Sequence, residues 1–192
     1  MNLALEIAAV ALNLVYLVLL IRENIACWFF GIAGSLTSIY LFYSLGLYSE
    51  SILYIYYVLI GFYGYTLWRK GSRDKPELKV NKISARVNFL IVGFGALSAF
   101  GVGHMFANYT GANNPYLDAF TTVFSFVASF LEAKKIISSW VYWIFINAAT
   151  IILYIQQELF IYLALTIVYL VFSVIGFKTW KKTLQLYAKN NA

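Results

Sequence analysis

Long apolar stretches follow one another along the chain, and polar and charged residues gather in the short connections between them. An apolar stretch of roughly 17–25 residues crosses the hydrocarbon core of a bilayer as an α-helix. We read seven such stretches, at about 3–21, 27–45, 51–68, 87–106, 116–131, 138–156 and 159–177. Pro76 and Pro115 both fall in connections, so no stretch is kinked by proline. The pattern predicts an all-α membrane protein with seven transmembrane helices.

The composition supports this class and excludes others. Of the 192 residues, 62% are hydrophobic and 11% are charged, whereas a soluble domain carries about 25% charged residues. An ordinary soluble protein and a disordered chain are both excluded. Cys27 is the only cysteine, so the chain has no internal disulfide. No cluster of metal ligands and no nucleotide-binding motif is visible, so we expect neither a metal nor another cofactor.

Positive charge alternates from one connection to the next. All fourteen Lys and Arg residues follow the first, third, fifth and seventh stretches, and the other connections carry none. Short loops rich in Lys and Arg stay in the cytoplasm. We therefore expect the N-terminus outside and the C-terminus in the cytoplasm. The basic run from Arg69 to Arg86 is explained by this topology, so we expect no nucleic-acid partner.

The first three stretches recur as the last three at an offset of 112 residues. Trp28 matches Trp140, Gly64 matches Gly176, and the end of the third stretch, Trp68-Arg69-Lys70, matches 180–182. We divide one transmembrane domain, 1–192, into repeat one (1–70), a linker helix (71–112) and repeat two (113–182). The offset covers four stretches, an even number, so the repeats are parallel. Parallel repeats are typical of some transporters, whose substrate site lies near the membrane midplane.

One helix face in repeat two carries candidate binding residues. Trp140, Trp143 and Asn147 are spaced i, i+3 and i+7, which places them on one side of a helix. Trp143 and Asn147 match Gly31 and Ser35, so they belong to repeat two alone. An amide at mid-depth should face the bundle and not lipid. The face predicts a slot for a flat aromatic ligand, and a cationic ring would gain cation–π attraction. The alternative is that Asn147 binds a neighbouring helix as part of ordinary packing.

Further polar and aromatic residues are candidates to line the same cavity, although each type is also common in helix packing. They are Asn13, Ser35, Thr37, Ser38, Tyr54, Tyr57, Ser125 and Ser129. We read no charged residue near the centre of a stretch: Glu6 and Asp118 lie at outer ends, and Glu50 and Glu158 lie in outer loops. Buried ionisable groups mark proton relays, so their absence argues against a proton-driven pump.

The pattern W-x-x-W-x-x-x-N from Trp140 to Asn147 follows the segment 118–122 and the pair Lys134-Lys135, and it precedes Tyr169, Gly176 and Trp180. In this context it closely resembles the PnuC family of bacterial vitamin-precursor transporters, over almost the whole chain. The resemblance implies a three-plus-one-plus-three fold like that of SWEET transporters, in the bacterial inner membrane. It further implies uptake of nicotinamide riboside by facilitated diffusion, with a cytoplasmic kinase trapping the substrate. A homotrimer is the assembly that the resemblance suggests.

One departure bears on the substrate. Family members that take nicotinamide riboside commonly carry amide side chains where this chain has Gly34, Tyr54 and Gly61. A thiamine transporter of the PnuT type is therefore the alternative within the family. The alternative from another class is a membrane sensor that binds the vitamin without moving it. We do not expect an enzyme, because no nucleophile–base pair is visible. The expected partners are a small vitamin or vitamin precursor and the lipid bilayer.

Overall fold

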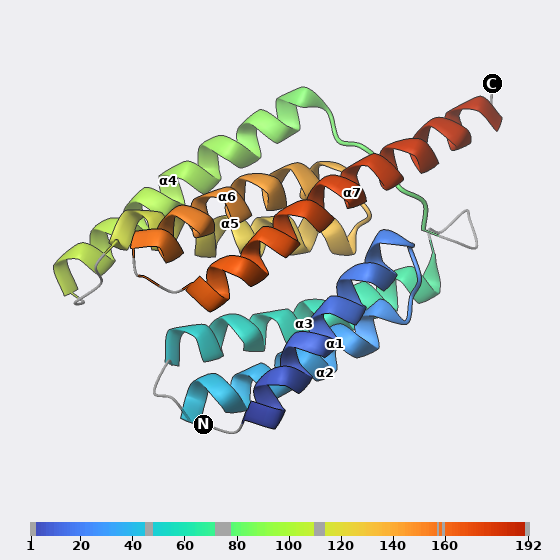
Figure 1. The fold of residues 1–192 in the computed structure, drawn as a ribbon. Helices are drawn as coiled ribbons and strands as arrows, with labels where there is room; N and C mark the ends of the chain where they lie inside the picture. The colour runs from blue at the N-terminus through green and yellow to red at the C-terminus, as the bar shows by residue number, and fades with distance from the viewer. Residues whose placement is uncertain are drawn as a thin grey trace. The chain divides into compact units, whose positions relative to one another are not determined.

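The computed structural model describes residues 3–44, 48–71, 78–109, 114–156, 158 and 160–190. Within these residues the chain forms seven α-helices (Figure 1). They are α1 (Leu3–Ile21), α2 (Cys27–Ser44), α3 (Tyr48–Lys70), α4 (Ala85–Tyr109), α5 (Pro115–Ala133), α6 (Ser138–Gln156) and α7 (Phe160–Asn190). Each predicted stretch is confirmed as a helix. The largest difference is in α7, which continues beyond the predicted end at 177 through the basic tail.

Three of the described helices are long and apolar enough to cross a membrane by length and composition: Ala85–Tyr109, Ser138–Gln156 and Tyr162–Lys189. Shorter apolar helices run over Leu5–Ile21 and Cys27–Leu41. The three candidate spans thus all lie after residue 84, and the two shorter apolar helices lie before residue 42.

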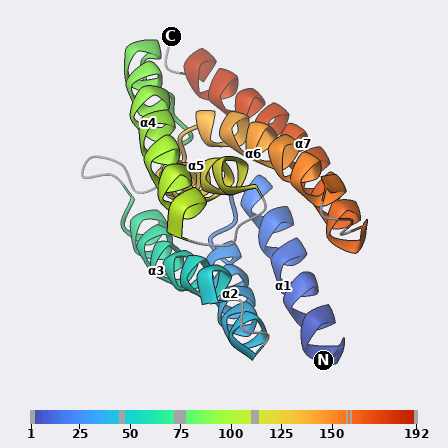
Figure 2. The same ribbon diagram turned by 90° about the vertical axis from the view of Figure 1, so that its left-hand side faces the viewer.

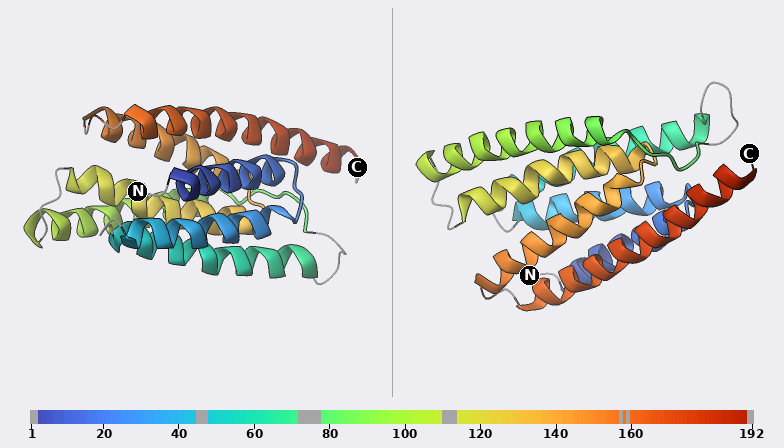
Figure 3. Two further views of the ribbon diagram at one scale, coloured as in Figure 1. Left: turned by 60° about the horizontal axis from the view of Figure 1, so that its bottom comes forward. Right: turned by 90° about the horizontal axis from the view of Figure 1, so that it is seen from above.

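The chain divides into two compact units, Met1–Lys79 and Val80–Ala192. In the first unit, α2 packs against α1 and against α3. In the second unit, α4 packs against α5, α5 against α6, and α6 against α7. Figure 2 shows α4 beside α5, and Figure 3 shows α6 beside α7. The linker helix α4 therefore packs with the second repeat.

The same turn joins α1 to α2 and α5 to α6. Its left-handed residue is Glu23 in the first repeat, with φ 56°, and Lys135 in the second, with φ 52°. Asn24 N donates to Leu19 O at 3.0 Å, and Ile136 N donates to Leu131 O at 2.9 Å. This six-residue closure, with the left-handed residue inside it, is the Schellman ending of a helix. The 112-residue repeat is thus present in the backbone, although the turn residues themselves differ.

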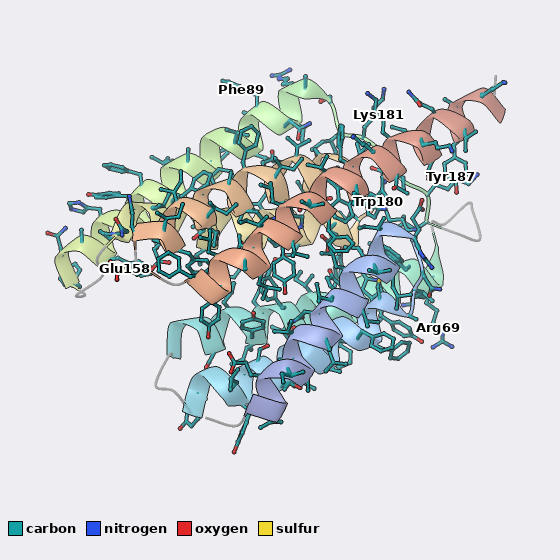
Figure 4. All side chains as sticks on the ribbon, viewed as in Figure 1. Arg69, Phe89, Glu158, Trp180, Lys181 and Tyr187 are labelled. Atoms are coloured by element: carbon teal, nitrogen blue, oxygen red, sulfur yellow. The ribbon has the colours of Figure 1, made fainter. Side chains whose placement is uncertain are left out.

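Each repeat contains a pair of tryptophans that pack edge to face. The rings of Trp28 and Trp68 lie 5.4 Å apart at 87°, and those of Trp140 and Trp180 lie 5.3 Å apart at 90°. Trp180 extends from the later part of α7 (Figure 4). Edge-to-face contacts of this kind are favourable because a ring's positive edge meets the negative face of its neighbour.

The first tryptophan of each pair packs directly against a glycine. A Cβ added at Gly64 would lie 2.3 Å from Cζ2 of Trp28. A Cβ added at Gly176 would lie 2.5 Å from Cζ3 of Trp140. Carbon atoms do not approach so closely, so the tryptophan can occupy its position only because the facing residue has no side chain.

The linker helix meets α5 through a stripe of small residues. Gly95, Ala99 and Gly103 of α4 are buried. A Cβ added at Gly103 would lie 2.7 Å from Cδ1 of Tyr116. The other side of α4 is apolar and exposed: Phe89, labelled in Figure 4, has 77% of its side chain accessible. Such a face suits a lipid environment.

The segment before α4 docks on the α5–α6 turn. Asn81 N donates to Lys135 O at 3.0 Å, and Ile137 N donates to Asn81 O at 2.9 Å. The side-chain amide of Asn81 also donates to Lys134 O, at 3.1 Å. Val80 beside it is buried. These hydrogen bonds hold the segment against the backbone of Lys134 and Lys135, just before α4 begins at Ala85.

Candidate substrate-binding site

The residues singled out by the sequence fall in both units. Trp140, Trp143, Asn147 and Ser125 lie in the second unit, on α5 and α6. Asn13, Ser35, Tyr54 and Tyr57 lie in the first unit, on α1, α2 and α3.

Trp140 is a packing residue of the α6–α7 pair. Its side chain is 0% exposed, enclosed by Trp180 and the glycine at 176. Trp28 has the same surroundings in the first repeat and is 2% exposed. A residue that both repeats use in the same way is explained by the fold. Trp140 therefore sets the position of α6 against α7, and within the second unit its ring faces are covered.

Trp143 turns toward a different neighbour. Its Nε1 donates a hydrogen bond to Oε2 of Glu132, at the end of α5, over 2.7 Å. The indole also packs against a buried cluster of Phe124, Ala128, Leu131, Ile136, Tyr142 and Ile146. Its side chain is only partly buried. An exposed part of a fixed aromatic ring is a surface on which a flat ligand can stack.

Sequence reasoning missed Glu132. The apolar stretch at 116–131 ends one residue before Glu132, whereas α5 continues to Ala133 and buries Glu132 to 2% exposure. The carboxylate lies at the end of α5 and not at its centre. The signal in the sequence is its repeat partner, Leu20, an apolar residue that is 0% exposed.

Asn147 faces the bundle, as its polarity predicts. It is 8% exposed, and its Nδ2 donates to Oγ of Ser173 on α7 at 3.1 Å. Ser173 Oγ in turn donates to Tyr169 O at 2.8 Å. The chain of donors orients the amide, so its carbonyl oxygen points away from Ser173. Asn147 thus takes part in helix packing, and its carbonyl group can accept from a ligand.

Ser125 and Ser129 are buried on α5, and Ser129 Oγ donates to Ser125 O at 2.7 Å. That bond turns the Ser129 hydroxyl back onto its own helix. Ser125 keeps its hydroxyl for other partners.

The first unit brings its candidates together in two places. The rings of Tyr54 and Tyr57 on α3 lie 5.5 Å apart at 82°. On α1, Asn13 lies against α2, because a Cβ added at Gly34 would be 2.8 Å from Asn13 Oδ1. Ser35 is buried next to that glycine.

Gly34 and Gly61 each have a packing reason. Gly34 leaves room for the amide of Asn13, and a Cβ added at Gly61 would lie 2.5 Å from Cγ1 of Ile32. A longer side chain at either position would have to displace its neighbour. Gly34 therefore leaves the space that the side-chain amide of Asn13 occupies.

Features that both repeats share are explained by the fold, whereas features of the second repeat alone are candidates for the substrate site. The tryptophan pairs, their glycines and the turn occur twice, whereas the polar contacts of the second repeat occur once. Glu132, Trp143, Asn147 and Ser173 match Leu20, Gly31, Ser35 and Gly61 at the 112-residue offset. These four residues, which we call the polar cluster, make two hydrogen-bonded pairs that the matching residues of the first repeat cannot make.

The family profile described as "Nicotinamide mononucleotide transporter" matches residues 3–182. The chain belongs to this family. Its resemblance to PnuC proteins is thereby confirmed, and so is its membrane-transporter class.

Relatives with curated names support the assignment to this transporter family. The chain is 26% identical to "Nicotinamide riboside transporter PnuC" of Neisseria mucosa, over 87% of this chain and 68% of that protein. It is 22% identical to the protein of the same name from Escherichia coli K12, over 82% of this chain and 77% of the relative.

A solved structure shares the fold of this family member. "Crystal structure of the Vitamin B3 transporter PnuC" matches 96% of this chain and 83% of its own with a TM-score of 0.79 and 26% identity. The predicted all-α, seven-helix, 3+1+3 fold class is confirmed.

Proposed function

We propose that the protein is a passive uptake transporter for nicotinamide riboside or a closely related vitamin precursor. The observation that carries the proposal is the polar cluster. Its two hydrogen-bonded pairs, Glu132–Trp143 between α5 and α6 and Asn147–Ser173 between α6 and α7, have no equivalent at the matching residues of the first repeat. The relatives named as nicotinamide riboside transporters support the choice of substrate.

The polar cluster suits a cationic aromatic ring with hydrogen-bond donors. The N–H of Trp143 is engaged by Glu132, so the indole offers its ring face. A cation over a desolvated indole gains about 2 kcal/mol. The carbonyl oxygen of Asn147 can accept from an amino or carboxamide group. Trp140 acts by holding α6 in place, and Ser125, Asn13, Ser35, Tyr54 and Tyr57 stay proposed substrate contacts.

Thiamine is the alternative substrate. It is also cationic and aromatic, and its aminopyrimidine can donate to Asn147. The aromatic pair of Tyr54 and Tyr57, with glycine at 34 and 61, favours a ligand with fewer hydroxyl groups than a riboside.

Transport is proposed to run down the substrate gradient without a coupled ion. No described helix centre carries an acidic residue that would serve as a proton relay, since Glu132 lies at a helix end. A passive carrier accumulates nothing by itself, so we propose that a cytoplasmic kinase traps the substrate by phosphorylation. We also propose a homotrimer in the bacterial inner membrane, which cross-linking in native membranes would detect.

We expect quenching of tryptophan fluorescence to identify the ligand. Saturable quenching of the purified protein by nicotinamide riboside is the expected result, with thiamine weaker and riboflavin without effect. The control variant Trp143→Phe removes the stacking indole and should lose most of the signal. A stronger response to thiamine would select the alternative substrate, and no response to any of the three would contradict the proposal.

We propose an outside N-terminus and a cytoplasmic C-terminus, and expect labelling of single cysteines to report this orientation. Cys27→Ser provides a cysteine-free background, because the repeat partner of Cys27 is Ser139 and both are 0% exposed. A membrane-impermeant maleimide should label Tyr109→Cys, at the exposed end of α4, in intact cells. Lys189→Cys, near the end of α7, should react only after permeabilisation. The reverse pattern would overturn the proposed topology.

A further inference from the structure

The buried carboxylate of Glu132 is not required by the fold around it. Burying an ionisable group is unfavourable unless specific partners compensate it. The first repeat builds the same Schellman turn with Leu20, which is 0% exposed, where the second has Glu132. An apolar residue therefore satisfies this position, and the carboxylate needs another explanation.

Trp143 is a residue that Glu132 contacts, and this contact supplies an explanation. Oε2 of Glu132 accepts from Nε1 of Trp143 at 2.7 Å, across the α5–α6 turn. The repeat partner of Trp143 is Gly31, so the first repeat lacks both members of the pair. Satisfying a buried indole N–H is not a sufficient reason. Within the described residues, the indole nitrogens of Trp28, Trp140 and Trp180 are buried without a hydrogen-bond partner.

The surroundings of Trp143 show why its ring needs a fixed orientation. In the first repeat the ring of Tyr16 occupies the space beside Gly31, 2.8 Å from an added Cβ. In the second repeat Ala128 stands at the position of Tyr16, and the large ring comes from Trp143 instead. A partly exposed tryptophan beside an alanine can adopt other rotamers. A directional bond to a carboxylate selects one of them.

We propose that Glu132 is a positioning residue: it orients the indole of Trp143 and occupies its N–H, so that the substrate meets only the ring face. The inference rests on the proposed function in taking Trp143 as the substrate contact. It adds that recognition at this residue is by stacking and that its geometry is set from α5.

The first test needs no substrate. Full-length protein in which every tryptophan is labelled with ¹⁵N should give five indole N–H signals in a ¹H–¹⁵N spectrum, one for each tryptophan. Trp143→Phe identifies the signal of Trp143 by removing it. In Glu132→Leu that signal should move upfield and broaden, while Glu132→Gln, whose carbonyl still accepts, should retain most of the original shift. A Trp143 signal that does not change in Glu132→Leu would overturn the proposal.

The second test is a double-mutant cycle on binding of nicotinamide riboside. Glu132→Leu should weaken binding about tenfold, the size expected for loss of a hydrogen bond to a charged group. It should have almost no further effect in the Trp143→Phe background, where there is no N–H to accept. Glu132→Gln should bind nearly as the wild type does.

A merely structural role gives a different result. The midpoint temperature of unfolding would then fall in Glu132→Leu, and the dissociation constant would be unchanged or would change equally in both backgrounds, which overturns the proposal. If the wild type binds no vitamin, the proposed function fails, and the indole spectrum still decides whether Glu132 orients Trp143.

Discussion

Replacing Trp143 with alanine is expected to reduce the rate of nicotinamide riboside uptake at low substrate concentration by roughly thirtyfold. The variant loses the ring face on which the substrate cation stacks, a contact of about 2 kcal/mol when desolvated. The protein should still fold, because the tryptophan pairs that close the repeats are Trp28–Trp68 and Trp140–Trp180. The measurement is initial uptake of radiolabelled nicotinamide riboside into cells, normalised to the amount of protein in the membrane.

Phe145→Ala is the matched control for this prediction. Phe145 is an aromatic residue of the same helix α6, two positions further on, and 64% of its side chain is exposed. Its removal should leave uptake close to the wild-type rate. Equal losses in both variants would indicate a general effect on α6, and an unchanged rate in Trp143→Ala would remove Trp143 from the site.

Gly176→Ala is expected to lower the stability of the protein. The new Cβ would lie 2.5 Å from the ring of Trp140, which is 0% exposed and packs edge to face against Trp180. Overpacking of this kind costs about 1–3 kcal/mol, and it opposes the gain of about 1 kcal/mol that alanine brings to a helix. Gly64→Ala should lower the stability for the same reason in the first repeat, where the added Cβ would lie 2.3 Å from Trp28. The midpoint of thermal unfolding of the purified protein in detergent measures both.

The control is a glycine of α4, Gly101. Apart from its chain neighbours and the backbone of its own helix, no atom lies within 4 Å of a Cβ added there. Gly101→Ala carries the same change in helix propensity without the collision, so it should be as stable as the wild type or slightly more stable. If Gly176→Ala were as stable as Gly101→Ala, the glycine would not be required to seat Trp140.

The sequence predicts the seven helices and the repeat because both depend on local features. Apolar stretches form helices whatever their neighbours are, and the tryptophans and glycines recur at one fixed offset. The predicted ends of the helices are less accurate than the predicted helices themselves. Hydropathy stops at the first charged residues, whereas the backbone of α7 continues its hydrogen bonding through Lys178, Lys181 and Lys182.

The roles of the site residues depend on geometry that spacing gives only roughly. At about 100° per residue, Asn147 lies about 20° from Trp140 around the helix, and Trp143 lies about 60° away. Trp140 and Asn147 accordingly both meet α7, and Trp143 meets α5. The side of α6 that carries these three residues is thus divided between two neighbouring helices. Spacing cannot show this division, because it depends on where the neighbouring helices lie.

Glu132 and Ser173 illustrate what one sequence leaves hidden. Glu132 follows an apolar stretch and precedes two lysines, so it has the local appearance of a loop residue. It becomes part of the interior because α5 continues to Ala133 and Glu132 meets Trp143 of α6. Ser173 is a common packing residue by type, and its importance comes from a partner 26 positions earlier in the chain.

The most direct test of the account is flux through the purified protein in liposomes, with a gradient of nicotinamide riboside and no gradient of any ion. Passive transport predicts saturable entry of the labelled substrate, unchanged by a protonophore or by replacing sodium with potassium, and reduced in Trp143→Ala. Binding without flux would identify a sensor, and flux that requires a proton or sodium gradient would contradict passive transport.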